Sequence, residues 1–176
     1  MCNDKVIELG RRRFIKLAAL GAGMTLVSAL PGGKAKASGR AKAVLLSCMD
    51  YRLTDETLAF MLSQDLKNNY DHLVLAGASL SISSDKFPEW QKTFWDHLKL
   101  ARELHHVEEV YVVDHRDCGA YKLVLGKEAV DTPEKETAVH TEYLKKFAAL
   151  VREREPGLEV RAFLEALDGT VETIEV

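Results

Sequence analysis

The sequence lacks internal repeats and low-complexity segments, and its apolar runs all fall short of the roughly 20 residues that cross a bilayer as a helix. Positive charge is also scarce, because 27 acidic residues outnumber the 24 lysines and arginines. An acidic balance gives no electrostatic case for binding nucleic acid or anionic lipid. We therefore expect no nucleic-acid partner.

The first 37 residues are predicted to be an export signal outside the fold. Residues 10–16 read Gly-Arg-Arg-Arg-Phe-Ile-Lys, residues 17–30 are an apolar stretch, and residues 35–37 form a small-x-small cleavage site. This is the pattern of a twin-arginine signal. A membrane anchor is the alternative, but 14 residues are too few to span a bilayer. We expect a periplasmic or otherwise exported protein, without a stable membrane anchor after cleavage.

The remaining residues, 38–176, are predicted to form a single domain with one core. They contain 17 basic and 25 acidic residues, so the formal net charge of this part is −8. Cys2 leaves with the signal, and only Cys48 and Cys118 remain. They are either a disulfide or a pair of metal ligands. Twin-arginine export carries folded proteins, so a metal can be bound while the thiols are still reduced.

Apolar runs alternate with helical periodicity along this domain. Strands are expected at residues 43–47, 72–76, 109–114, 158–164 and 170–174. Helices are expected to begin near residues 54, 89, 119 and 133, with an irregular loop at 81–88. The order predicts an α/β fold, with a mostly parallel central sheet, flanking helices and a C-terminal antiparallel edge.

Two short peptides carry the chemistry of the chain. Ser-Cys-Met-Asp-Tyr-Arg at residues 47–52 and Asp-His-Arg-Asp-Cys-Gly at 114–119 each follow an apolar run. Each therefore lies at the C-terminal end of a buried strand, where open α/β sheets bind ligands. Cys48, His115 and Cys118 provide three of the four ligands of a tetrahedral zinc ion.

The fourth position is left for water or for a carboxylate. In open sites zinc lowers the pKa of bound water to about 7, which favours hydration or hydrolysis chemistry. Asp50 and Arg52 lie two and four residues beyond Cys48. If Arg52 forks onto Asp50, the carboxylate is held off the metal and orients the nucleophile. If Asp50 binds the metal instead, the site is closed.

These residues resemble the β-class carbonic anhydrases. That family carries Cys-x-Asp-x-Arg at one strand end and His-x-x-Cys-Gly at another, and both patterns are present here. A Gly-Ala-Ser segment at residues 77–79 is placed like the family's Asn-Ala-Gly loop, and a terminal hairpin also matches. The resemblance covers most of residues 43–174.

The resemblance implies a zinc enzyme that hydrates carbon dioxide to bicarbonate, with one ion per chain and usually in a homodimer. Its metal ligands would be Cys48, His115 and Cys118. Asp50 and Arg52 would be the catalytic pair that orients the nucleophile. Similar proteins of this fold hydrolyse carbonyl sulfide or carbon disulfide, so the fold does not decide the substrate.

Three features depart from the family pattern. The first strand begins soon after the predicted cleavage site, where the family usually has helices that embrace a partner subunit. The spacing from Cys48 to His115 is longer than usual, and Asp114 stands where glycine is common.

A noncatalytic zinc module with Asp50 as permanent fourth ligand is one alternative function. A redox protein with a Cys48–Cys118 disulfide is another.

The remaining histidines carry no partner motif. His105 and His106 end a predicted helix, where a cation suits the helix dipole. His72, His97 and His140 are expected at the surface or the edge of the core.

Overall fold

A five-stranded sheet in the order β2-β1-β3-β4-β5 forms the centre of the protein. The computed structural model describes residues 39–176, and the predicted export signal lies outside these residues. The strands β1 to β4 run parallel, and β5 pairs antiparallel with β4. This confirms the predicted α/β fold with an antiparallel edge. The strands are β1 Ala43–Ser47, β2 Tyr70–Val74, β3 Glu109–His115, β4 Glu159–Glu165 and β5 Val171–Ile174.

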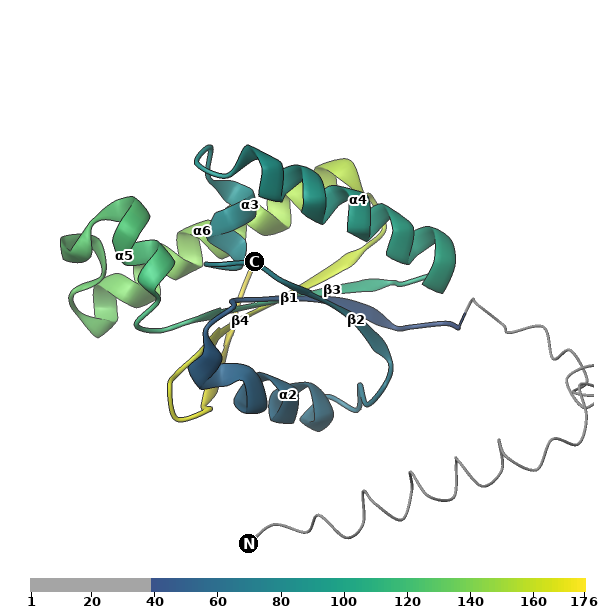
Figure 1. Ribbon diagram of the computed structural model, residues 1–176, viewed down its shortest axis with the longest axis horizontal. Helices are drawn as coiled ribbons and strands as arrows, with labels where there is room; N and C mark the ends of the chain where they lie inside the picture. Colours follow the sequence, from purple (N-terminus) through teal and green to yellow (C-terminus); the bar gives the residue numbers. More distant parts are fainter. Residues whose placement is uncertain (1–38) are drawn as a thin grey trace, which may run out of the picture. The chain divides into compact units, whose positions relative to one another are not determined.

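Helices cover both faces of the sheet, which explains why β1 and β3 are buried along their whole length and apolar at most positions. In Figure 1, α3, α4 and α6 lie over one face and α2 lies over the other. None of the helices in residues 39–176 is long and apolar enough to cross a membrane. The helical elements are η2 Tyr51–Leu53, α2 Thr54–Ser63, α3 Ser79–Ser83, α4 Pro88–His105, α5 Gly119–Leu125, η3 Lys127–Val130 and α6 Pro133–Arg154.

Each face of the sheet has its own apolar core. The larger core joins β1, β3 and β4 to α4 and α6 through residues such as Leu46, Phe94 and Phe147. The smaller core lies under α2 and contains Met61 and Tyr111. Because successive side chains of a strand point to opposite faces, neighbouring residues of β3 contribute to different cores.

Several expected elements differ from the observed ones. The segment 81–88, expected to be a loop, begins inside the short helix α3, whose Ser81 hydroxyl bonds the carbonyl of Ala78. The second strand begins at Tyr70 rather than residue 72, because Tyr70 pairs with the start of β1. Leu58 and Leu62, two apolar residues of α2, lie outside its buried face and are 48% and 43% exposed.

Candidate metal centre

The candidate site lies at the switch point of the sheet. β1 is flanked by β2 on one side and by β3 on the other. The connection after β1 therefore leads to one side of this strand, and the connection after β2 leads to the opposite side. Ligands bind in the crevice that such a switch opens at the carboxyl ends of the strands. Cys48 follows β1, His115 ends β3, and Cys118 is the N-cap residue of α5.

The structure brings the three predicted ligands together. The ligand atoms of Cys48, His115 and Cys118 all lie within 4.8 Å of one another. Donor atoms on one tetrahedral zinc ion are about 3.5 to 4 Å apart, so these three are close enough to share an ion. In the described residues, 39–176, they form the only such group of three. The predicted convergence at the sheet edge is therefore confirmed.

The hydrogen bonding of the His115 ring fits a role as metal ligand. Its Nδ1–H donates to the carbonyl of Arg116 at 2.8 Å, which leaves the lone pair of Nε2 free. Nε2 is buried and has no hydrogen-bond partner within residues 39–176. A buried nitrogen acceptor without a partner is costly, and a metal ion would satisfy it. The donor set of two sulfurs and one imidazole matches zinc.

The two cysteines form no disulfide, and their sulfurs lie within 4.8 Å of each other. A hydrogen bond from Cys118 lowers the pKa of the Cys48 thiol, and the same contact together with burial raises the pKa of Cys118. Burial lowers the pKa of His115, but the neighbouring Cys48 sulfur more than offsets this, so the net shift is upward. Metal ions bind the thiolate form, so a bound cation would displace the proton that the raised pKa of Cys118 retains.

Asp50 and Arg52 form a fork beside these ligands. Arg52 Nε donates to Asp50 Oδ1 at 2.9 Å, and Nη2 donates to Oδ2 at 2.7 Å. These bonds lower the pKa of Asp50 to about 2, so the carboxylate is ionised at neutral pH. Asp50 Oδ2 lies 3.8 Å from His115 Nε2. The pair therefore faces the position that a metal would occupy, with both carboxylate oxygens engaged by Arg52.

Asp117 is a third member of this group that sequence reasoning missed. Arg52 Nη1 donates to Asp117 Oδ2 at 2.8 Å, and Lys122 forms an ion pair with the same carboxylate. Asp117 has a φ of +59°, and its N–H donates to Glu136 at 2.7 Å. Arg52 thus ties the two motif peptides together. In the sequence, the acidic residue directly before Cys118 was the available indication that Asp117 belongs to the site.

A strained loop approaches Cys48 from the other side. The N–H of Gly77 donates to Cys48 Sγ at 3.3 Å. Gly77 has a φ of +80°, and a Cβ there would lie 3.0 Å from the Cβ of Ala120, so glycine is required. The next residue, Ala78, has φ +38° and ψ −102°. For a residue with a side chain this costs about 1 to 3 kcal/mol.

Asp114 is the centre of a buried hydrogen-bond network on the opposite face of β3 from His115. Its Oδ1 accepts the N–H of Ser79 at 2.9 Å. Its Oδ2 accepts the hydroxyls of Ser79 and Tyr121, both at 2.6 Å, and lies 3.0 Å from Nδ1 of His140. The expectation that His140 lies at the surface or core edge is wrong, because its side chain is fully buried.

Glu165 is a buried carboxyl at the end of β4, paired in register with His115. Thr57 donates to Oε2 at 2.8 Å, but Oε1 has no partner within residues 39–176. Burial raises the pKa of Glu165, and nearby Glu56 adds to this, while Thr57 and His115 oppose it. An ionised Glu165 is thus disfavoured in the folded state.

Replacement of Glu165 by glutamine should stabilise the metal-free protein at pH 8 by about 1 kcal/mol. A carboxyl whose pKa is raised on folding contributes stability below its unfolded pKa and loses it as pH rises through the folded pKa. The gain should therefore vanish at pH 4. Urea unfolding in the presence of a chelator measures both values. An equal gain at both pH values would contradict the assigned cause.

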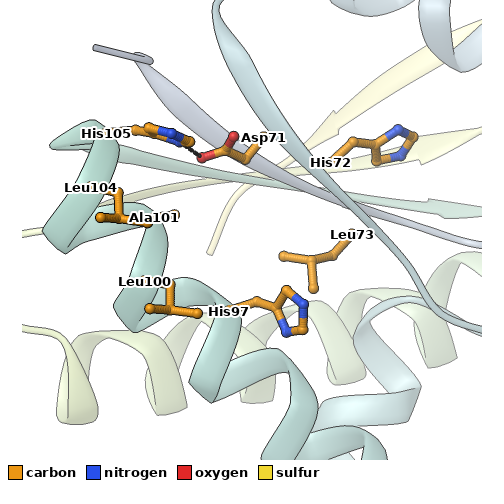
Figure 2. Close-up of a pocket in the computed structure, with 8 residues that line it drawn as sticks. All are labelled: Asp71, His72, Leu73, His97, Leu100, Ala101, Leu104 and His105. Atoms are coloured by element: carbon orange, nitrogen blue, oxygen red, sulfur yellow. Dashed lines mark hydrogen bonds and ion pairs between the residues drawn. The ribbon is translucent and has the colours of Figure 1, made fainter. Parts of the chain in front are cut away.

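Another cavity lies away from this site. It has a volume of about 260 Å³ and lies between β2 and α4 (Figure 2). Three histidines border it, but they do not converge on one point: His105 pairs with Asp71 at 2.7 Å, and His72 bonds Ser47. The cavity is lined by Asp71, His72, Leu73, His97, Leu100, Ala101, Leu104 and His105.

Comparison with known proteins identifies a matching family model and related sequences. A family model described as "Putative carbonic anhydrase" matches residues 38–175. An uncharacterized protein of Rickettsia conorii is 43% identical over 139 residues, which cover 79% of this chain and 75% of that protein. An uncharacterized protein of Rickettsia bellii is 40% identical over 139 residues, with coverage of 79% and 85%.

Solved structures show the same fold at low sequence identity. A carbonic anhydrase from Glaciozyma antarctica superposes with a TM-score of 0.51 at 20% identity, covering 94% of this chain and 95% of that chain. A tetrameric β-carbonic anhydrase from Sordaria macrospora gives 0.56 at 11% identity, with coverage of 97% and 96%. Together with the family match over residues 38–175, this shows that the chain belongs to the carbonic anhydrase family, as a divergent member with the β-class fold.

Proposed function

We propose that this protein is a zinc-dependent carbonic anhydrase that hydrates carbon dioxide to bicarbonate. The observation that carries the proposal is the convergence of Cys48, His115 and Cys118 beside an aspartate held by arginine. The family match supports the reaction class.

The residues have separate tasks in this reaction. Two thiolates and the Nε2 of His115 would hold one zinc ion, which when bound makes water a nucleophile near neutral pH. Asp50 is ionised near neutral pH, so it could accept a hydrogen bond from the nucleophilic water and orient it. Arg52 fixes the direction of that carboxylate through its fork and through Asp117.

The geometry supports the catalytic function over a noncatalytic zinc module. In the noncatalytic alternative, Asp50 is itself the fourth metal ligand. Both of its oxygens instead accept hydrogen bonds from Arg52. The free thiols of Cys48 and Cys118 favour metal ligation over a disulfide.

Metal analysis combined with stopped-flow hydration kinetics on the purified full-length chain tests the proposal. We expect one zinc per chain, hydration above the buffer rate, loss of activity on chelation and recovery on zinc addition. The measurements should run from about pH 6 to about pH 9, which brackets the pKa of about 7 of zinc-bound water. Stoichiometric zinc without hydration at any of these pH values would reject carbon dioxide. Carbonyl sulfide and carbon disulfide would then be the substrates to assay.

The proposal includes export by the twin-arginine route and function as a homodimer. Export is supported by the arginine, apolar and small-x-small segments of residues 10–37. Sequencing the N-terminus of the protein recovered from a periplasmic extract tests cleavage after Ala37. Light scattering of the same preparation tests the dimer.

A further inference from the structure

We propose that Asp114, with Ser79, Tyr121 and His140, forms a positioning network that presents the Gly77 N–H to the sulfur of Cys48. The inference builds on the metal site of the proposed function but not on the reaction that the site performs. None of these four side chains belongs to the predicted ligand or catalytic set. Asp114 is a positioning residue, because it acts on Cys48 only through the loop of residues 77–79.

The contacts form a continuous chain from Asp114 to the sulfur. Asp114 holds both the N–H and the hydroxyl of Ser79, at 2.9 and 2.6 Å. Ser79 is the first residue of α3, and Ala78 precedes it. Gly77 comes next and donates its N–H to Cys48 Sγ at 3.3 Å. A displacement of Ser79 therefore moves the donor that contacts the ligand.

The backbone conformation of Ala78 explains why the loop of residues 77–79 needs stabilising contacts from outside the loop. Its φ of +38° is a conformation that favours glycine, so an unrestrained loop would relax away from it. The N–H of Ala78 bonds Leu75 and the N–H of Leu80 bonds Gly77, which are local contacts within the loop. The bonds from Ser79 to Asp114 anchor this loop to β3.

The network also links the segments that carry the three candidate ligands. Asp114 directly precedes His115 in β3, and Tyr121 lies in α5, whose N-cap residue is Cys118. Ser79 leads through Gly77 to Cys48, and His140 attaches the network to α6. All four network side chains are at most 1% exposed. A buried and fully bonded carboxylate of this kind fixes the relative positions of these segments.

The N–H donor has a defined effect on the sulfur. A hydrogen bond to a thiolate withdraws charge from it and restricts its direction, and such outer contacts tune metal sites. Loss of the Gly77 donor should leave Cys48 more electron-rich and less well placed. The sulfur-to-metal charge-transfer band of a cobalt-substituted protein reports the first effect, and the cobalt affinity reports the second.

Asp114→Asn is the test variant, because an amide keeps the shape but loses one of the two acceptor oxygens. Glu109→Gln is the matched control. Glu109 is the first residue of the same strand, is also buried, and is ion-paired with Lys42 at 3.0 Å and Arg161 at 3.3 Å. It lies six residues, about 20 Å, from His115. Both variants remove a buried negative charge, but only one contacts the network.

Amide hydrogen exchange of Gly77, followed by nuclear magnetic resonance on the metal-free protein, is the first measurement. We expect the Gly77 amide to exchange about tenfold faster in Asp114→Asn and at the wild-type rate in Glu109→Gln. Cobalt titration is the second measurement. We expect binding to weaken by about 10- to 100-fold in Asp114→Asn, with the charge-transfer band at lower energy.

A third variant tests the role of loop strain. In an Ala78→Gly background, Asp114→Asn should reduce the cobalt affinity less, because glycine adopts this backbone conformation without the bonds to Asp114.

If Asp114→Asn does not fold, Ser79→Ala replaces it and should give smaller changes of the same sign in exchange rate and cobalt affinity. An unchanged Gly77 exchange rate, or equal changes in both charge variants, would overturn the proposal. A wild-type protein that binds no cobalt would instead reject the proposed function, while Gly77 exchange still decides the network.

Discussion

Serine in place of Cys48 is expected to weaken zinc binding by on the order of a thousandfold and to reduce carbon dioxide hydration to the rate of buffer alone. A serine hydroxyl stays protonated at neutral pH, so the site loses one of two anionic ligands and keeps only Cys118 and His115. The remaining two ligands cannot complete a tetrahedral zinc site. Zinc content of the purified variant and a competition titration with a chelator measure the loss.

Cys2→Ser is the matched control, since this cysteine lies in the predicted export signal and outside the predicted site. It should retain wild-type zinc and activity. Cys118→Ser should behave like Cys48→Ser, because both thiols belong to one group. Thiol titration of the nonreduced wild-type protein belongs to the same experiment. Full zinc occupancy in Cys48→Ser would contradict the assigned ligand set, and a wild type without free thiols would favour the disulfide.

The positions of the three candidate ligands were predictable because each depends on local sequence. Cys48 directly follows an apolar run, and His115 ends another, so the strand ends could be located from hydrophobicity alone. Parallel strands place these ends at one edge of the sheet. The short spacing from His115 to Cys118 then brings the third ligand to the same crevice. The long helices α4 and α6 were predictable from their apolar period.

The Asp114 network was not predictable, because its members come from four separate segments. Ser79 is 35 residues from Asp114, and His140 is 26 residues away on the other side. A lone histidine in an amphipathic helix has no signal that distinguishes a buried partner from a surface position. The exposure of Leu58 and Leu62 has a related cause. The angle at which α2 crosses the sheet decides which stripe is buried, and here it buries Thr57 and Met61.

Arg52→Lys is expected to retain zinc while reducing kcat/KM for carbon dioxide hydration by about 100-fold. Arg52 holds both oxygens of Asp50 with two separate nitrogens and reaches Asp117 with a third. A lysine ammonium is a single point donor and cannot reproduce this fork. Asp50 would then lose its fixed direction toward the nucleophile, although the metal ligands remain unchanged.

The pH dependence separates loss of orientation from loss of charge. Arg52 lowers the pKa of Asp50 from 3.8 to about 2, so its stabilising effect is present above pH 4 and is lost as pH falls toward 2. Even at the unshifted pKa of 3.8, Asp50 is ionised above pH 6. The hydration profile between about pH 6 and pH 9 should therefore keep its shape and fall uniformly. A changed midpoint would indicate that Arg52 acts on the metal-bound water instead.

Arg161→Lys is the matched control for this variant. Arg161 also bridges two carboxylates, Glu109 at 3.3 Å and Glu159 at 3.0 Å, near the amino ends of β3 and β4. The Arg161→Lys variant should lose a comparable ion-pair network but keep its activity, because Arg161 is remote from the crevice that holds the candidate metal site. Arg52→Lys with wild-type kcat/KM would remove Arg52 and Asp50 from the catalytic set. An equal loss in both variants would mean that the fork supports the fold rather than the direction of Asp50.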